Sequence, residues 1–380
     1  MYGAQLIAAL RSEFSDQIEF FGVGGDKMRA AGCETVVDAK DLAVVGITEI
    51  LGQLPKIWRL FHHLIDEADR RKPDLAVVID SPGFNWRVAR EMKKRGVPVV
   101  YYVCPQFWAW RQGRVKLLRD YVDKALVIFP FEEKFYRDHD VDAEFVGHPL
   151  ADLPRPKVSR EEYAKEFDLD ASKQWITLMP GSRRKEVRMN LPGILASAAM
   201  LGDGFEFPLP VAPTLDTDYF APFLIPARKV RERVHLVPEA LPALAHSRAG
   251  IIASGTATVE AALMELPFVM VYRVTALTYL LGRSAVKVPH FAMVNLIAGE
   301  QVVLELVQQD FTPERAVAEI RNILPDGQAR TEMVRGLHLV RTQLSSPAGT
   351  ASAPARAAAA VRKLLRHSAL AQFGREKENP

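Results

Sequence analysis

The sequence has few cysteines, no long apolar run and little net charge, and each shortage excludes a class of protein. Its two cysteines, Cys33 and Cys104, lie far apart, so we exclude a disulfide framework and a structural zinc site and expect a reducing compartment. No apolar run approaches the ~20 residues that span a bilayer, and no signal-peptide pattern opens the chain. A net charge of +3 is too small for a dedicated nucleic-acid-binding protein. We therefore expect a cytoplasmic protein that is soluble or bound to a membrane surface.

The chain is nevertheless rich in short apolar runs that alternate with amphipathic segments. With 380 residues and 48% hydrophobic residues, two domains with packed cores are expected. Continuous apolar runs of four to seven residues are typical of parallel strands covered on both faces. They predict strands at 75–79, 97–103, 124–129, 143–146, 175–179, 234–237, 250–253 and 267–272.

This alternation predicts an α/β protein with two Rossmann-like domains facing across a cleft. We place the N-terminal domain at 1–153 and, after a proline-containing linker, the C-terminal domain at 157–345. The chain looks helical from about residue 312. Residues 346–380 are expected to form a C-terminal helix and a frayed tail.

Two glycine-containing turns in the second half predict an anion site. Each follows a predicted strand and precedes a predicted helix, which is how α/β proteins aim backbone N–H groups at phosphate. The first turn contains Gly181, Ser182 and Arg183, and the second contains Ser254, Gly255, Thr256 and Ala257. The Arg183 guanidinium suits phosphate oxygens, and a cation at a helix start opposes the helix dipole unless an anion is bound. Together the turns indicate a diphosphate ligand held from two sides, as in a nucleotide-sugar site.

Four further side chains are candidates for chemistry, each with a structural alternative. Asp80 ends a predicted strand and suits a general base toward a hydroxyl, or it caps the next helix. Glu260, one turn into the second helix, suits ribose hydroxyls or complements the helix dipole. Trp108 and Trp110 lie in a loop after a strand, where large rings line a ligand cleft or plug the domain junction.

The segment from 47 to 71 carries more apolar residues than one helix stripe requires. Lys56, Arg59, His62 and His63 are interleaved with them. One interpretation is a buried helix kinked at Pro55. The other is an interfacial helix that inserts apolar side chains into lipid beside basic ones.

Six motifs together resemble lipid-A-disaccharide synthase. They are VIDSPGFN at 78–85, VCPQFWAWR at 103–111, FVGHP at 145–149, LMPGSR at 178–183, ASGTATVE at 253–260 and VNLIAGE at 294–300. The resemblance runs in the family's order from residue 2 to about 345. It implies a GT-B fold and an inverting glycosyl transfer from UDP-2,3-diacylglucosamine to 2,3-diacylglucosamine 1-phosphate, called lipid X. The products would be lipid A disaccharide 1-phosphate and UDP.

The resemblance also assigns roles to residues of this chain. It implies that Asp80 is the base, that Arg183 contacts the donor diphosphate, and that Asn295 and Tyr272 lie on the donor side. Neither a metal nor a cofactor is implied, because helix ends and Arg183 would replace a divalent cation. The resemblance implies a peripheral location on the inner face of the inner membrane of a Gram-negative cell. It also implies a possible homodimer. Membrane association is implied for Ile47, Ile50, Leu51, Leu54, Ile57, Trp58 and Phe61.

The chain departs from the family at its start. Family members begin with a strand and a glycine-rich loop that precede the Gly3-Ala4 of this sequence. We therefore expect the first domain to lack its first strand, which is normally central, and to expose neighbouring strand edges. Two alternatives stay open: another UDP-sugar enzyme of the same fold, such as a sugar 2-epimerase, and an inactive, membrane-associated protein that binds UDP-sugars.

Overall fold

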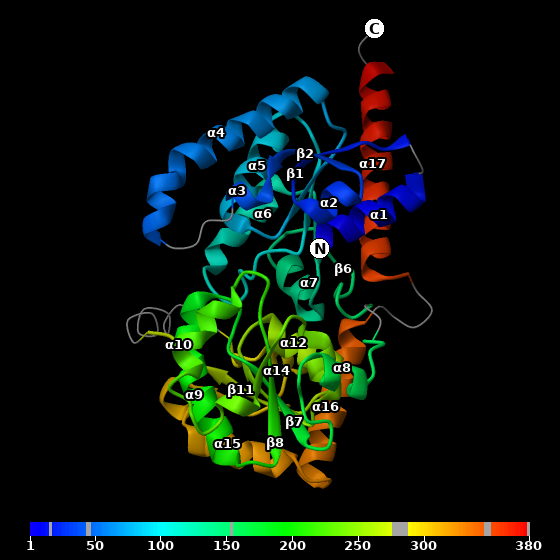
Figure 1. Cartoon of the computed structure of the whole chain (residues 1–380). Coiled ribbons are helices and arrows are strands. Elements are labelled where there is room, and N and C mark those ends of the chain that lie inside the picture. The colour runs from blue at the N-terminus through cyan, green and yellow to red at the C-terminus, as the bar shows by residue number, and fades with distance from the viewer. Residues whose placement is uncertain (15–16, 43–46, 153–154, 276–287, 346–350, 378–380) are drawn as a thin grey trace. The chain divides into compact units, whose positions relative to one another are not determined.

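The computed structural model describes residues 1–14, 17–42, 47–152, 155–275, 288–345 and 351–377 (Figure 1). They form two compact units. The first unit combines Met1–Asp152 with Ser345–Pro380, and the second unit spans Leu153–Leu344. The last segment of the chain, for which a C-terminal helix and a frayed tail are expected, thus belongs to the first unit.

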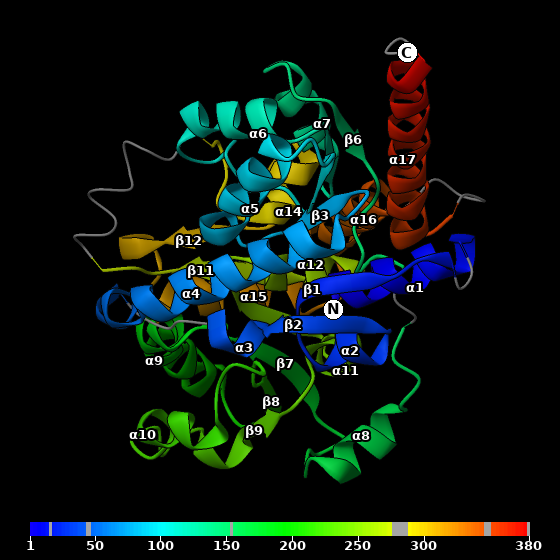
Figure 2. The same ribbon diagram turned by 90° about the horizontal axis from the view of Figure 1, so that it is seen from above.

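The first unit alternates helices with short strands. Its strands are β1 (Phe20–Gly24), β2 (Cys33–Asp38), β3 (Ala76–Ile79), β4 (Val99–Tyr102), β5 (Lys124–Val127) and β6 (Ala143–Phe145). Its helices are α1 (Tyr2–Phe14), α2 (Asp26–Ala30), α3 (Ala39–Leu42), α4 (Ile47–Arg71), α5 (Pro82–Lys94), α6 (Val115–Tyr121), α7 (Pro130–Arg137) and α17 (Ala353–Lys377). Figures 1 and 2 show α17 beside α1, where Arg362 and Glu13 form an ion pair of 2.9 Å.

The strands of the first unit form two separate parallel sheets. One contains β1 and β2, and the other has the order β3-β4-β5-β6. Within the described residues, β1 therefore pairs with β2 alone and β3 with β4 alone. Both sheets nevertheless share one hydrophobic core, in which Val37 of β2 packs together with Phe61 of α4 and Val78 of β3.

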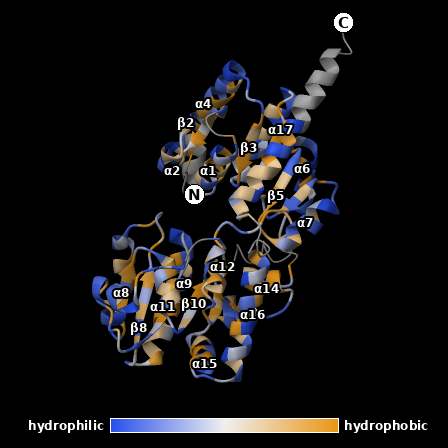
Figure 3. Cartoon of the chain, turned by 90° about the vertical axis from the view of Figure 1, so that its right-hand side faces the viewer, coloured by the Kyte–Doolittle hydropathy of each residue, from blue (hydrophilic) through white to orange (hydrophobic). Residues whose placement is uncertain are grey.

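The second unit is an α/β layer structure. Its strands are β7 (Gln174–Met179), β8 (Phe205–Pro210), β9 (Val234–Val237), β10 (Ala249–Ala253), β11 (Phe268–Tyr272) and β12 (Glu305–Val307). Its helices are α8 (Arg160–Glu166), α9 (Arg184–Leu201), α10 (Ala221–Leu224), α11 (Ala240–His246), α12 (Thr256–Leu263), α14 (Met293–Ala298), α15 (Pro313–Ile323) and α16 (Gln328–Leu344). Figure 3 shows apolar residues concentrated on the strands and polar residues on the outer sides of the helices.

The six strands of this sheet are parallel and follow the order β12-β11-β10-β7-β8-β9. The chain builds outward from β7 to β9, then returns to the other side of β7 with β10. The strand order thus reverses between β7 and β10, and ligands of open α/β sheets bind beyond the carboxyl ends of the strands at such a point. The predicted α/β class and all eight predicted strands are confirmed, and no predicted strand end differs from the observed one by more than two residues.

Candidate functional site

Asp80 lies between β3 and α5 in an uncommon backbone conformation. Asp80 and Ser81 have φ angles of 49° and 45°, in the left-handed region, which costs a non-glycine residue of order 1–3 kcal/mol. Two side chains hold this bend. The Tyr101 hydroxyl donates to the Asp80 carbonyl oxygen at 2.7 Å, and Asn85 Nδ2 donates to the same oxygen at 2.7 Å. The bend is therefore fixed by its neighbours, as expected where a side chain is aimed for function.

The Asp80 carboxylate is exposed and forms no hydrogen bond or ion pair with another described residue. A carboxylate with free lone pairs can accept a proton from an incoming hydroxyl. The alternative interpretation was a helix cap. However, the N-cap residue of α5 is Ser81, and no side chain caps this helix. The geometry thus leaves the Asp80 carboxylate available for chemistry.

The two predicted substrate tryptophans occupy different environments. Trp108 is 6% exposed, its ring meets Phe131 edge-on at 4.8 Å between centroids, and its indole N–H donates to Glu132 Oε1 at 2.9 Å. Trp110 is 46% exposed, with the Arg111 guanidinium 4.4 Å from its ring centroid. Trp110 can therefore touch a substrate, whereas Trp108 anchors the loop in the core.

Glu132, which the sequence analysis did not single out, is the anchor for this loop. Its buried carboxylate also accepts hydrogen bonds from the backbone N–H groups of Ile128 and Phe129, at 3.3 and 3.1 Å. Burial raises the pKa of Glu132 to about 7. A glutamate three residues after the N-cap Phe129 is a sequence signal for such a role.

The first turn of the second unit connects β7 to α9. Gly181 has a φ of 119°, and a Cβ atom there would lie 2.6 Å from Glu186 Cβ, so only glycine fits. Asn190 Nδ2 donates to the Pro180 carbonyl at 3.2 Å, and Thr214 Oγ1 donates to the Ser182 carbonyl at 2.7 Å. These bonds fix the turn from both sides.

The anion-binding amides of this turn are already in use. The Glu186 carboxylate accepts from the backbone N–H of Ser182 at 2.9 Å and of Arg183 at 3.2 Å. Glu186 also pairs with the Arg183 guanidinium at 2.7 Å. A carboxylate of the chain itself therefore takes the position expected for phosphate, and a diphosphate must displace it to reach the same donors.

The second turn, between β10 and α12, leaves its amides open. Gly255 has a φ of 137°, and Ser254 Oγ donates to the Phe291 carbonyl at 2.8 Å. Within the described ranges, the backbone N–H groups of Thr256 and Ala257 donate to no acceptor. This helix start therefore has the donors that an anion requires.

The two turns lie at the same edge of one sheet. Strand β10 pairs with β7 in parallel, and Ile252 lies opposite Met179. Each turn begins one or two residues after this pair, so the two turns start side by side. The reversal of strand order falls between these two strands. Two glycine turns, an arginine and open amides therefore converge at the position where α/β sheets bind nucleotides.

Glu260 follows the second turn by one helical turn. Its side chain is partly buried and forms no hydrogen bond with another residue that the structure describes. Burial raises the pKa of Glu260 to about 7. A carboxylate without a partner in such surroundings is a candidate ligand for hydroxyl groups.

Comparison with known proteins gives the family. The family profile described as lipid-A-disaccharide synthetase matches residues 1–357. The lipid-A-disaccharide synthase of Koribacter versatilis (strain Ellin345) is 52% identical over 361 residues, which cover 95% of this chain and 94% of the relative. The enzyme of Acidobacterium capsulatum is 47% identical over 93% of this chain and 90% of the relative. The chain belongs to the lipid-A-disaccharide synthase family. It is thus a glycosyltransferase of lipid A biosynthesis.

Solved structures support the fold that the synthase family implies. A putative UDP-N-acetylglucosamine 2-epimerase from Listeria monocytogenes has a TM-score of 0.63 and 14% identity, covering 96% of this chain and 94% of its own. A calicheamicin glycosyltransferase has a TM-score of 0.55 and 17% identity, covering 96% and 95%. The predicted GT-B fold is confirmed by these neighbours, which at such identities show the fold alone.

Asn295, the donor-side residue suggested by the synthase resemblance, is fully buried. Its Nδ2 donates to the Val303 carbonyl and to Glu305 Oε1, at 2.9 and 2.8 Å. Its Oδ1 accepts from the backbone N–H groups of Val302 and Val303. These four bonds use the full capacity of an asparagine side chain. In this arrangement Asn295 holds the loop at 302–305 and offers no free group to a ligand.

Glu305 connects Asn295 to the second turn. Its carboxylate accepts from the backbone N–H groups of Phe291 and Ala292, at 2.9 and 3.0 Å. The Phe291 carbonyl in turn accepts from Ser254, and the Tyr272 ring stacks on Phe291 at 6.2 Å. Burial raises the pKa of Tyr272, and the nearby Glu186 carboxylate adds to the effect. Tyr272 therefore lies close to the residues of the first turn.

The predicted membrane segment of the synthase family has a mixed environment. Ile47, Ile50 and Leu51 lie outside the described side chains. Leu54 is 48% and Trp58 59% exposed, whereas Phe61 is 7% exposed and packs in the core; Ile57 is partly buried. Leu54 and Trp58 are therefore exposed apolar residues of α4, and the exposed basic residues Lys56 and Arg59 are their neighbours in the sequence. Lys56 is paired with Asp41 at 2.6 Å. These four residues are called the α4 face below.

The described residues contain neither a membrane-spanning helix nor a cluster of metal-ligating side chains. No helix there is apolar over a length sufficient to cross a membrane. Likewise, no group of three or more histidine, cysteine, aspartate or glutamate side chains in those ranges is arranged to hold a metal ion.

Proposed function

We propose that the chain transfers 2,3-diacylglucosamine from UDP to the 6-hydroxyl of 2,3-diacylglucosamine 1-phosphate. Asp80 takes the hydroxyl proton while the oxygen attacks the anomeric carbon of the donor. The bond from that carbon to the diphosphate oxygen breaks, and UDP leaves with its electron pair. The product is the β-1′,6-linked disaccharide 1-phosphate, with inversion at the anomeric carbon.

The observation that carries this proposal is the pair of glycine turns at the reversal of the second sheet. The open amides of Thr256 and Ala257 and the guanidinium of Arg183 stabilise the negative charge that develops on the leaving diphosphate. Glu260 accepts hydrogen bonds from the ribose hydroxyls. Support for the base comes from the Asp80 carboxylate, which is exposed and has no hydrogen-bond or ion-pair partner among the residues that the structure describes.

The direct test supplies both lipid substrates to the purified chain and follows the products by mass spectrometry. We expect the disaccharide 1-phosphate and one UDP per disaccharide. Parallel reactions with unacylated UDP-sugars separate this activity from that of other UDP-sugar enzymes of the same fold. Product from unacylated donor alone, or an epimerised sugar without transfer, contradicts the proposal.

The raised pKa of Glu260 predicts a pH-dependent affinity for UDP. Only the ionised carboxylate accepts from both ribose hydroxyls, so we expect affinity to rise as the pH increases through about 7. The folded protein binds this proton more tightly than the unfolded chain. Stability therefore falls as the pH rises from about 4.5 to about 7. Calorimetric titration with UDP and thermal melts across this range measure both effects.

Glu260→Gln is the control for this pH effect, because the amide keeps the shape and does not titrate. We expect weaker UDP binding, a flatter pH dependence of affinity, and a stability that no longer declines between the same pH values. Identical pH profiles for the two proteins show that Glu260 does not titrate in the donor site.

We further propose that the α4 face binds the cytoplasmic membrane surface. Leu54 and Trp58 insert into lipid while Lys56 and Arg59 contact anionic head groups. Replacing both Leu54 and Trp58 by serine removes apolar area that is now exposed, so binding to vesicles containing anionic phospholipid should fall about tenfold or more. Co-sedimentation with such vesicles measures this loss.

Leu339→Ser provides the matched control for membrane binding. Leu339 is 53% exposed on α16 of the second unit, so its change removes an exposed leucine outside the α4 face. Equal vesicle binding by the α4 variant and by wild type rejects the α4 face as the membrane contact.

A further inference from the structure

The loop between β4 and α6, residues 103–114, carries a cation that the roles described above do not use. Arg111 is exposed, and its guanidinium lies 4.4 Å from the ring centroid of Trp110. It forms no ion pair and no side-chain hydrogen bond with another described residue. A guanidinium that stacks on an indole keeps its N–H fork free for an anion. Arg111 is therefore held against a ring and still has its donors available.

The backbone of this loop has an uncommon conformation near both ends. Val103 and Arg111 have φ angles of 58° and 56°, in the left-handed region that β-branched and bulky residues avoid. Such residues persist where neighbouring contacts hold them, and they cluster at ligand sites. Asp80 has the same conformation after the neighbouring strand. The loop and the Asp80 bend therefore share a backbone conformation that is typical of ligand sites.

Helix α7 fixes the loop at two points. The Trp108 indole N–H donates to Glu132 at 2.9 Å, and the Tyr136 hydroxyl donates to the Pro105 carbonyl. Glu132 and Tyr136 are four residues apart, so they lie on the same face of the helix. These two contacts hold the segment that precedes the exposed Arg111.

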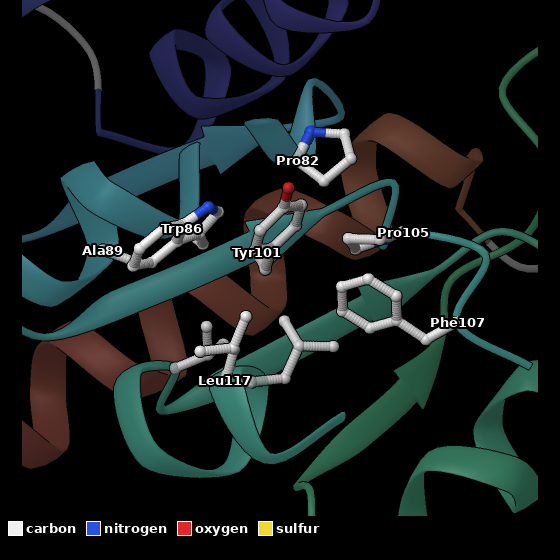
Figure 4. Close-up of a pocket in the computed structure, with 9 residues that line it drawn as sticks. Pro82, Trp86, Ala89, Tyr101, Pro105, Phe107 and Leu117 are labelled. Carbon is white, nitrogen blue, oxygen red and sulfur yellow. The ribbon is translucent and has the colours of Figure 1, made fainter. Parts of the chain in front are cut away.

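This loop and Asp80 begin side by side at one edge of the sheet. Strands β3 and β4 pair in parallel, and the Asp80 N–H donates to the Tyr102 carbonyl at 3.1 Å. Figure 4 shows where the two segments meet, with Pro82, Pro105 and Phe107 around one small apolar cavity. The carboxyl edge of parallel strands is where α/β sheets bind ligands. A carboxylate and a cation, each without a described partner, therefore come from neighbouring segments of that edge.

The arginines near the start of α5 are already engaged, unlike Arg111. Arg87 donates to the Gly83 carbonyl, and Arg90 lies 3.6 Å from the carboxylate of Glu91. A guanidinium without a partner binds an added anion more readily, because no existing bond has to be broken first. Arg111 is therefore the stronger candidate for an anion that is bound close to Asp80.

We propose that Arg111 binds the phosphate of the acceptor, 2,3-diacylglucosamine 1-phosphate. The inference rests on the proposed function and adds a specificity residue to its acceptor site. A guanidinium fork pairs with two phosphate oxygens at once. The reacting 6-hydroxyl and the 1-phosphate belong to the same sugar, on either side of its ring oxygen. Asp80 receives the proton of the hydroxyl while Arg111 holds the phosphate, so the sugar is fixed at two points when it attacks the donor.

The test compares acceptors with and without the phosphate, in wild type and in Arg111→Ala. For the phosphorylated acceptor, kcat/KM of the variant should fall roughly 10- to 100-fold, as for the loss of a charge-assisted pair. For 2,3-diacylglucosamine, which lacks the phosphate, the two proteins should behave alike. The donor KM should stay unchanged. Equal losses with both acceptors, or no loss with either, overturn the inference.

Two further variants secure this comparison. Arg111→Gln removes the charge but keeps a long side chain beside Trp110 and should give the same result, so a folding defect in one variant leaves the other to decide. Arg114→Ala is the matched control, because Arg114 is exposed and lies three residues further along the chain. We expect it to prefer the phosphorylated acceptor as strongly as wild type does. An equal loss of this preference in the control indicates a general charge effect and overturns the inference.

Direct binding of both acceptors, measured by equilibrium dialysis, separates this inference from the proposed reaction. Phosphate-dependent binding that is lost in Arg111→Ala, without disaccharide formation by wild type, supports the Arg111 site and overturns the proposed transfer. Disaccharide formation with the same acceptor preference in wild type and in the Arg111 variants overturns the Arg111 site alone. Co-sedimentation with vesicles of anionic phospholipid tests the other source of phosphate. Loss of vesicle binding with an unchanged acceptor preference assigns Arg111 to a phospholipid head group and also overturns the inference.

Discussion

Asp80→Asn should lower the turnover of disaccharide synthesis by about 10²–10⁴-fold, the usual contribution of a general base. The amide cannot accept the acceptor proton, but it has the same size as the carboxylate. Asparagine also tolerates the left-handed backbone of this position, whose carbonyl is held by Tyr101 and Asn85. The fold and the affinity for UDP should therefore persist. Mass spectrometry of the product measures the turnover, and calorimetry measures the affinity for UDP.

Asp74→Asn is the matched control for this change. Asp74 is exposed, precedes the same strand and lies six residues before Asp80, so its loss of charge affects the same region of the first unit. We expect wild-type turnover for the control. An Asp80→Asn enzyme that turns over at a near-normal rate refutes the assignment of Asp80 as the base.

Arg183→Ala should lower kcat about 10²–10³-fold and weaken UDP binding, as loss of one group that stabilises transition-state charge typically does. The guanidinium is 79% exposed and bonded only to Glu186 among the described side chains, so its removal disturbs no core contact. Without this guanidinium, only the backbone amides at the helix starts stabilise the charge on the departing diphosphate. Arg231→Ala, an exposed arginine elsewhere in the second unit, should behave as wild type.

Glu186→Gln should act in the opposite direction on UDP binding. The wild-type carboxylate occupies the amides of Ser182 and Arg183 and competes with a diphosphate for them and for the guanidinium. Removing its charge should tighten UDP binding roughly two- to fivefold, the range of a single charge at a helix start. If UDP affinity is unchanged in both Arg183→Ala and Glu186→Gln, the first turn does not bind the diphosphate.

The positions of the candidate groups along the strands could be predicted because local sequence determines them. Buried parallel strands are continuous apolar runs, and the residues that follow them lie at the carboxyl edge of a sheet. Asp80, the first turn at Gly181 and the second at Gly255 were located in this way. The pairing of β7 with β10 could not be predicted from the sequence, because strand order depends on how distant segments of the chain pair.

The side-chain partners could not be predicted, because they come from elsewhere in the chain. The sequence left open whether Trp108 lines a ligand cleft or fills the domain junction, and in the structure its indole N–H donates to the buried Glu132. The family resemblance implies that Asn295 contacts the donor substrate, but in the structure the loop at 302–305 takes up all the hydrogen bonds of its side-chain amide. Glu186 carried a readable signal, since a glutamate three residues into a helix commonly caps it.

Strands β1 and β2 were missed for a different reason. Their sequences, Phe20–Gly24 and Cys33–Asp38, are short and interrupted by glycine or polar residues. Neither forms a continuous apolar run, and most of their residues are only partly buried. Partial burial weakens the apolar signal on which strand prediction depends.

The division of the first unit into two sheets has a consequence for handling the protein. Strands β1 and β3 each keep a row of backbone donors and acceptors with no sheet partner in the described residues. Such rows accept extended peptides from other molecules, including further copies of the same chain. We therefore expect self-association by strand addition in concentrated solutions, and a peptide that pairs with one of these strands should compete with it.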